Sequence, residues 1–128
     1  MQGVGGVFRV DDLGLPGVLR VVPPRYADGR GHFSETWNAR SFAAAGIREV
    51  WVQDNQSLSR RAGTVRGLHY QSPPHAQAKL VRVLRGRILD VAVDARAGSP
   101  GFGHWVGVEL SAGGGEQLYI PAGFLHGF

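Results

Sequence analysis

The sequence contains no cysteine, and Lys79 is its single lysine. Without thiols the chain can form no disulfide framework, no thiolate nucleophile and no cysteine-ligated zinc site. No apolar run is long enough to cross a bilayer, and the N-terminus lacks the charged segment and apolar core of a signal peptide. We therefore expect a cytoplasmic protein in which imidazole and carboxylate side chains carry any chemistry.

Basic residues exceed acidic ones, 14 against 10, and give a formal net charge of +4. All but one of these cations are arginines, whose guanidinium groups suit phosphate and carboxylate. The arginines are scattered and form no stripe with interleaved aromatic residues, so nucleic-acid binding is not expected. An anionic small-molecule substrate fits this composition, and a genome that favours arginine codons would explain it equally well.

The length of 128 residues and the hydrophobic content of 43% suit one domain, spanning residues 1–128. Its 20 glycines and 7 prolines are spread along the chain and punctuate short β-branched runs, as in an all-β protein. We predict extended segments at residues 18–22, 32–37, 50–59, 65–71, 78–84, 87–94, 104–110, 117–121 and 124–128. The short turn at Arg85-Gly86 predicts that the strands on either side of it pair as a hairpin.

One helix is predicted, at residues 40–45, because Asn38 can cap it and Gly46 stands where helices commonly end. Many short antiparallel strands with a single helix indicate a β-sandwich or jelly roll, in which inward and outward side chains alternate along each strand. Residues 124–128 are apolar and lack the polar fraying of a natural chain end. We therefore expect further C-terminal strands in the complete fold.

Residues 66–71 carry the most chemical information. In an extended strand His69 and Gln71 share one face, and we expect that face to line the interior of the sandwich. A neutral imidazole, with a pKa of about 6.5, can remove a proton next to a carbonyl group. A buried ammonium at Lys79, on the next strand, can stabilise the resulting enolate oxygen. Arg66 can bind a diphosphate.

These residues also have plain structural interpretations. His69 can be a hydrogen-bonded core or surface histidine, and Arg66 can be a surface charge. His126 is flanked by apolar residues, so we expect it to lie inside, where its structural interpretation is a packed histidine that a carboxylate such as Asp90 or a backbone carbonyl satisfies. The other three histidines are more simply surface or supporting residues; they are His32, His75 and His104. A metal site is disfavoured, since Gln71 and Lys79 stand where a second histidine and a carboxylate would be needed.

Six motifs occur in order along nearly the whole chain. They are Asp28-Gly29-Arg30-Gly31-His32-Phe33-Ser34-Glu35, Gln53-Asp54-Asn55, Arg66-Gly67-Leu68-His69-Tyr70-Gln71, Gln77-Ala78-Lys79-Leu80-Val81, Asp90-Val91-Ala92-Val93-Asp94 and Ile120-Pro121-Ala122-Gly123-Phe124-Leu125-His126-Gly127-Phe128. Together they resemble the dTDP-4-dehydrorhamnose 3,5-epimerase family. The resemblance implies a cupin-type jelly roll that acts without metal or cofactor on a dTDP-4-keto-6-deoxy sugar and forms a homodimer.

The resemblance also implies roles for individual residues. The histidine at the position of His69 would be the general base that removes protons at C3 and C5, and the lysine at Lys79 would stabilise the enolate. Residues implied to hold the nucleotide or the sugar are Arg30, Glu35, Gln53, Asp54, Asn55, Arg66 and His126. Residues implied to support them are Asp90, Phe33 and Gln71. The strand at residues 30–35 would reach toward the partner's site.

In the family, a tyrosine that returns the proton from the opposite face and an aspartate that orients the base follow the His-Gly-Phe motif, which here ends at Phe128. We therefore expect this chain to exchange the C3 proton with solvent, and net inversion to fall sharply. The alternatives are an epimerase of C3 alone, a 3,4-ketoisomerase, a non-catalytic module that binds nucleotide sugars and, more distantly, a metal-dependent cupin oxygenase.

Overall fold

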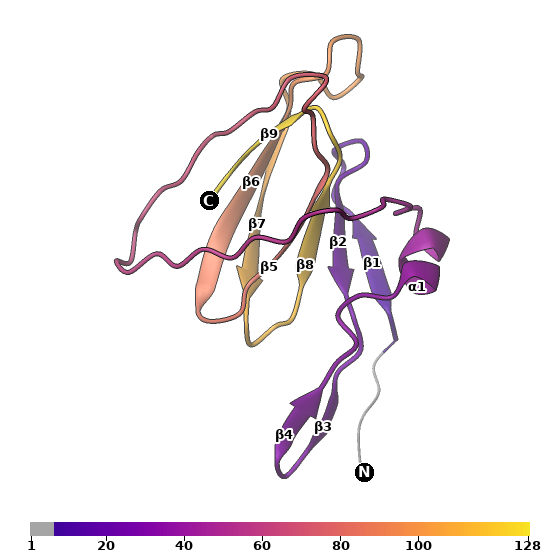
Figure 1. The fold of residues 1–128 in the computed structure, drawn as a ribbon, viewed down its shortest axis with the longest axis vertical. Helices are drawn as coiled ribbons and strands as arrows, with labels where there is room; N and C mark the ends of the chain where they lie inside the picture. Colours follow the sequence, from indigo (N-terminus) through magenta and orange to yellow (C-terminus); the bar gives the residue numbers. More distant parts are fainter. Residues whose placement is uncertain (1–6) are drawn as a thin grey trace.

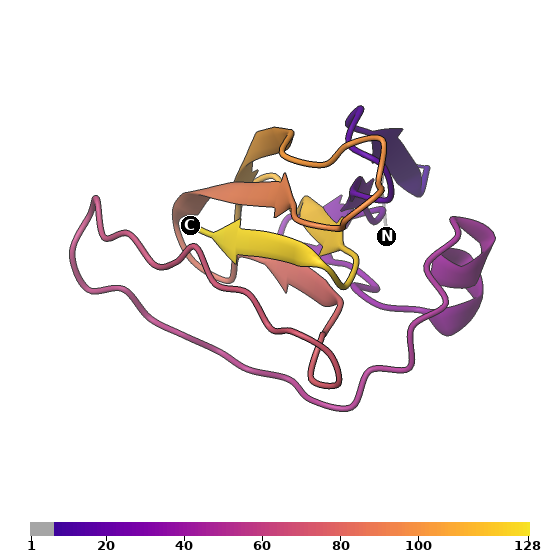
Figure 2. The same cartoon turned by 90° about the horizontal axis from the view of Figure 1, so that it is seen from above.

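The computed structural model describes residues 7–128, and this part of the chain forms nine β-strands and one short helix. Two antiparallel sheets face each other, with strand orders β1-β2-β8-β5 and β7-β6-β9 (Figures 1 and 2). The strands are β1 (Arg9–Asp12), β2 (Leu19–Val22), β3 (Tyr26–Asp28), β4 (Gly31–Phe33), β5 (Lys79–Arg82), β6 (Arg87–Asp94), β7 (Trp105–Ser111), β8 (Gln117–Ile120) and β9 (Phe124–Gly127), and the helix is α1 (Ala39–Ala44).

The main core lies between the two sheets. Along β6 the residues Asp90, Ala92 and Asp94 are buried and alternate with more exposed ones, as expected for a strand with one inward face. The core side chains are Leu15, Val18, Ala92, Val108, Leu110, Leu118, Ile120 and Phe124. Burying a large apolar side chain contributes about 1.5–3 kcal/mol, so each large apolar residue of this core stabilises the packing of the two sheets.

The predicted hairpin between residues 78–84 and 87–94 is wrong, although both strands form. β5 pairs with β8, whereas β6 pairs with β7 and β9. Val81 of β5 and Ile88 of β6 pack against the same core. Because each strand buries one face in that core, the two lie in opposite sheets, and the turn between them carries the chain from one sheet to the other.

The helix α1 packs on the outer face of the four-stranded sheet. Asn38 caps it as predicted, since its Oδ1 accepts hydrogen bonds from the backbone N–H groups of Arg40 (3.0 Å) and Ser41 (3.1 Å). Gly46 follows the helix at φ +91°, a conformation that favours glycine. The helix contributes Phe42 to a second buried cluster, which consists of Val21, Phe42, Ile47 and Tyr119.

Residues 48–78 join α1 to β5 without a strand of their own, and they loop outward from the sheets (Figures 1 and 2). The strand predicted at residues 50–59 is therefore wrong, and the extended segment predicted at 65–71 forms only an isolated bridge with β9. Val50 and Val52 are 86% and 88% exposed. Alternating apolar residues form a strand only where a neighbouring strand takes up their backbone hydrogen bonds, and no strand within residues 7–128 does so here.

The β3-β4 hairpin extends away from both sheets (Figure 1). The strand predicted at residues 32–37 is confirmed only at its start, because β4 ends at Phe33 and the chain then turns toward α1. Ser34 Oγ donates a hydrogen bond to the backbone carbonyl of Pro24 (2.8 Å) at this turn. The guanidinium of Arg25 donates to two carbonyl groups in the β7-β8 loop and so ties the base of the hairpin to the sandwich.

Candidate active site

His126 and Asp90 form a buried pair on the inner face of the three-stranded sheet. β9 places His126 inward beside the core residue Phe124, and β6 places Asp90 inward beside Ala92. The Nε2 atom of His126 contacts Oδ1 of Asp90, and the two residues are 6% and 0% exposed. The interpretation of His126 as a packed histidine held by Asp90 is therefore confirmed. The second oxygen of Asp90 is buried without a hydrogen-bond partner among the described residues.

His69 lies directly opposite His126. The backbone N–H of His69 donates to the carbonyl of His126 (2.7 Å), and the backbone N–H of His126 donates to the carbonyl of His69 (2.9 Å). Residues that are directly opposite in an antiparallel pair carry their side chains on the same face, so the register directs His69 toward the interior face. His69 is nevertheless exposed, contrary to prediction, because no strand within residues 7–128 covers this edge of the sheet.

Lys79 begins β5 on the facing sheet. It shares a face with Val81, which packs against the core between the sheets, and the Lys79 side chain is half-buried. Within residues 7–128 it makes no ion pair with a carboxylate. The strand registers therefore place Lys79 on the inner face of one sheet, and His69 and His126 on the inner face of the other.

Arg66 reaches the β9 edge through its backbone and a neighbouring loop through its side chain. Its N–H donates to the carbonyl of Phe128 (2.6 Å), and the N–H of Phe128 donates back (2.9 Å). The guanidinium donates from Nε to Ser59 Oγ (3.0 Å) and from Nη2 to the carbonyl of Leu58 (3.1 Å). These bonds leave other N–H groups of the fork available to an anion.

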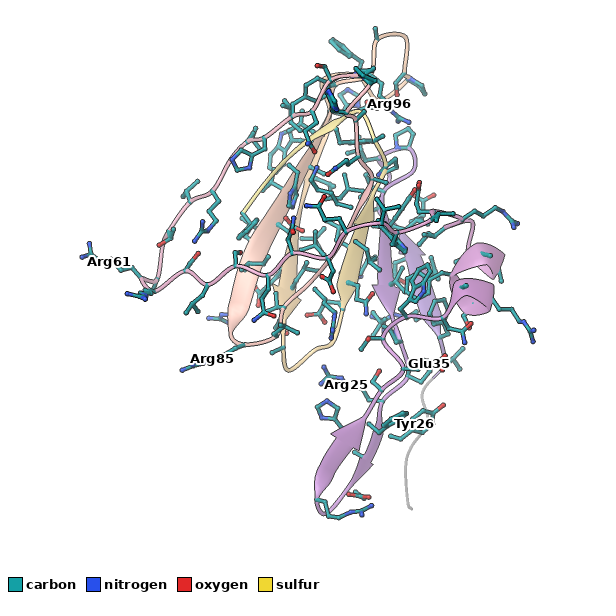
Figure 3. All side chains as sticks on the ribbon, in the orientation of Figure 1. Arg25, Tyr26, Glu35, Arg61, Arg85 and Arg96 are labelled. Atoms are coloured by element: carbon teal, nitrogen blue, oxygen red, sulfur yellow. The ribbon has the colours of Figure 1, made fainter. Side chains whose placement is uncertain are left out.

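The remaining predicted site residues lie elsewhere. Arg30 and Phe33 are exposed on the β3-β4 hairpin, where Arg30 pairs with Asp28 (2.7 Å). Glu35 lies at the base of the hairpin near Tyr26 (Figure 3), in a hollow that Phe8, Pro24, Tyr26, Asn38, Ser41 and Phe42 also line. The exposed polar residues of the segment 48–78 include Gln53, Asp54, Asn55 and Gln71. The described chain does not bring these four residues to the inner face that carries His126.

Two side-chain hydrogen bonds between a loop and a strand could not be predicted from the sequence. Tyr119 donates a hydrogen bond to Glu49 Oε1 (2.6 Å), 70 positions away, and burial together with that carboxylate raises the pKa of Tyr119. Asp94 accepts hydrogen bonds from the Arg96 guanidinium at the end of the sandwich opposite the hairpin (Figure 3), and this holds the pKa of Asp94 below its usual range. Both interactions join loops to strands of the sandwich.

Within residues 7–128, no group of three or more histidine, aspartate or glutamate side chains is placed to hold a metal ion. The same part of the chain contains no helix with the length and apolar character needed to span a membrane.

Two facing antiparallel sheets with one short helix, and with polar residues directed between the sheets, define an all-β jelly roll of the cupin type, as predicted. The family model described as dTDP-4-dehydrorhamnose 3,5-epimerase matches residues 12–128. The chain is 51% identical over 120 residues to a dTDP-4-dehydrorhamnose 3,5-epimerase of Sinorhizobium fredii, covering 91% of this chain and 60% of the relative. The chain belongs to the dTDP-4-dehydrorhamnose 3,5-epimerase family.

Solved structures agree with this assignment. The crystal structure of a Bacillus anthracis dTDP-4-dehydrorhamnose 3,5-epimerase with TDP and PPi bound has a TM-score of 0.92 and 43% identity, covering 95% of this chain and 70% of that chain. A Legionella pneumophila 3,5-epimerase in complex with dTDP-4-keto-L-rhamnose has a TM-score of 0.89 and 46% identity, with 95% and 64% covered. The chain spans 60% and 63% of the curated relatives from S. fredii and Shigella flexneri.

Proposed function

We propose that this chain supplies the base of an isomerase that epimerises dTDP-4-dehydro-6-deoxy-D-glucose at C3 and C5 to dTDP-4-dehydro-L-rhamnose. The observation that carries the proposal is the register of His69 opposite His126 on one inner face, with Lys79 on the inner face of the other sheet. A carbon acid next to a ketone needs a base and a positive charge near the ketone oxygen, and we assign these roles to His69 and Lys79.

In this mechanism the neutral imidazole of His69 removes the proton from C3 of the sugar. The electron pair of the broken C–H bond moves into the ring as an enolate, with its charge on the C4 oxygen. Lys79 is unpaired among the described carboxylates, so its ammonium is free to stabilise that oxygen. The enolate carbon can take its new proton from water, which gives exchange. Inversion requires that a proton donor on the opposite face deliver the proton to C3, a role that the family resemblance gives to a tyrosine after the His-Gly-Phe motif, and the same steps at C5 complete the reaction.

Substrate recognition follows from charge and position. Arg66 would bind the diphosphate, since its guanidinium is anchored to the Leu58 carbonyl and keeps donors free. His126, fixed by Asp90, would contact the sugar. On the family resemblance we also propose Gln53, Asp54 and Asn55 as substrate contacts and Gln71 as a supporting residue, although the described chain leaves all four exposed on the segment 48–78. We further propose a cytoplasmic homodimer in which the projecting β3-β4 hairpin carries Arg30, Phe33 and Glu35 toward the partner's site. No metal or cofactor enters this scheme.

The proposal is tested by incubating the protein with dTDP-4-keto-6-deoxyglucose in deuterated water and locating deuterium by NMR. Label at C3 and C5 together with conversion to the L-rhamno product supports double epimerisation, whereas label without conversion shows exchange alone. His69→Asn is expected to abolish the exchange. His75→Asn is the matched control, because His75 is an exposed loop histidine to which the mechanism gives no role. Equal exchange by the parent and His69→Asn proteins would contradict the assignment of the base.

A second candidate is an epimerase of C3 alone. A dTDP-4-dehydrorhamnose 3-epimerase of Streptomyces niveus is 40% identical over 122 residues, and the structure of a Streptomyces bikiniensis 3'-monoepimerase has a TM-score of 0.82 with 37% identity. Deuterium at C3 without deuterium at C5 would select this candidate. Binding of thymidine diphosphate without any exchange would instead identify a non-catalytic nucleotide-sugar-binding module.

A further inference from the structure

The contact between residues 66–69 and the end of β9 contains one extra residue. Arg66 exchanges both backbone hydrogen bonds with Phe128, and His69 exchanges both with His126. Phe128 and His126 are two positions apart, whereas Arg66 and His69 are three apart. Gly67 and Leu68 therefore both lie opposite Gly127, which is the definition of a β-bulge.

The bulge changes which side chains share a face. In a regular strand, residues three positions apart point to opposite faces. Phe128 and His126 point the same way, and their ring centroids are 5.8 Å apart. Because each lies directly opposite its partner, Arg66 and His69 are brought to that same inner face despite their odd separation.

Gly67 makes the bulge sterically possible. Its φ is +100°, and a Cβ at this position would lie 2.6 Å from the carbonyl oxygen of His126 and 2.9 Å from the Cα of Gly127. Gly127 is constrained from the other side, since its own Cβ would lie 2.8 Å from the carbonyl oxygen of Arg66. In both cases the obstacle is backbone, which cannot move aside as a flexible side chain can.

We propose that Gly67 is a positioning residue of the site, with Gly127 as its counterpart on β9. It acts through the bulge, which places the diphosphate-binding arginine and the base histidine on one face. This inference rests on the proposed function for the roles of Arg66 and His69, and on the backbone geometry alone for their common orientation.

The test compares Gly67→Ala with Gly63→Ala. Gly63 lies in the same segment at φ +80° with open space around its Cβ position, so this control reproduces the backbone strain without the collision. For Gly67→Ala we expect loss of the nuclear Overhauser contacts between His69 and His126. Exchange at C3 should fall roughly 100-fold and the affinity for thymidine diphosphate roughly 10-fold, in line with small displacements of reacting groups. The Gly63→Ala protein should match the parent in all three measurements.

Several outcomes would overturn the inference. One is a parent protein without nuclear Overhauser contacts between His69 and His126, and another is a Gly67→Ala protein within threefold of Gly63→Ala in exchange and affinity. If Gly67→Ala fails to fold, Gly127→Ala decides the matter, because it introduces the collision without a positive φ. If the parent neither exchanges nor binds thymidine diphosphate, the proposed function fails, and the nuclear Overhauser comparison still decides whether Gly67 sets the orientation.

Discussion

Replacing Lys79 with methionine tests the electrostatic part of the proposed reaction. The change removes the ammonium and keeps an unbranched side chain that can fill the same half-buried space beside Val81. Since Lys79 forms no ion pair with the described carboxylates, its removal leaves no acidic partner uncompensated within residues 7–128. The expected consequence is therefore a slower reaction in a protein of similar stability.

The magnitude follows from the environment of Lys79. At a half-buried site an effective dielectric constant of about 20 applies, and two unit charges about 4 Å apart then attract by about 4 kcal/mol. That value is an upper bound, and it corresponds to about a 1000-fold change in rate. Removing one donor from an oxyanion site typically costs about 100- to 1000-fold. We expect C3 exchange by Lys79→Met to fall within this range.

The assay is deuterium incorporation at C3 of dTDP-4-keto-6-deoxyglucose, followed by NMR, with thymidine diphosphate affinity measured in parallel. Arg82→Met is the matched control, because it removes a cation from an exposed position of the same strand. Lys79→Met should lose exchange and keep its affinity for the nucleotide, and Arg82→Met should lose neither. An exchange rate for Lys79→Met within threefold of the parent would refute the assignment of Lys79 to the enolate.

Three further predictions concern residues that stabilise the fold. Asp90→Asn should destabilise the fold by about 1–3 kcal/mol in chemical denaturation, because it weakens the buried contact to His126; unchanged stability would argue against that pair. Asp94 has a pKa lowered by Arg96, so its stabilising contribution is present above about pH 4 and lost as the pH falls toward its folded pKa. Denaturation at pH 7 and pH 3 should therefore show a smaller acid effect for Asp94→Asn than for the parent, and equal effects would contradict this. Asn38→Ala should lower the free energy of unfolding by about 1 kcal/mol through loss of the α1 cap. Asn55→Ala is the control, because Asn55 is exposed and caps no helix.

Local features of the fold could be predicted from the sequence because their causes are local. The alternation in residues 87–94 predicted β6 with its observed bounds, since one face of that strand is buried and the other is not. Asn38 and Gly46 marked the ends of α1 because each satisfies the helix terminus through its own side chain or backbone. The inward position of His126 was likewise predictable from its apolar neighbours.

Strand pairing could not be predicted in the same way. A short turn at residues 85–86 is compatible with a hairpin and with a crossover, and only the shared core between the two sheets selects the crossover. Residues 50–59 have the pattern of a strand and lack a neighbouring strand within the described chain, so they remain extended and exposed. A periodic pattern specifies which side chains prefer burial, and it does not specify which backbone will supply the hydrogen bonds.

The sequence by itself determined the residue types of the site, the absence of thiol chemistry, the all-β class and the positions of most strands. Tertiary structure alone decided that β5 and β6 lie in opposite sheets, that Asp90 rather than a backbone carbonyl holds His126, and that a bulge at Gly67 directs Arg66 and His69 to one face. The physical reason is the distance along the chain over which each effect acts. Composition and periodicity act within a few residues, whereas strand pairing, side-chain burial and side-chain orientation depend on segments that meet only when the chain is folded.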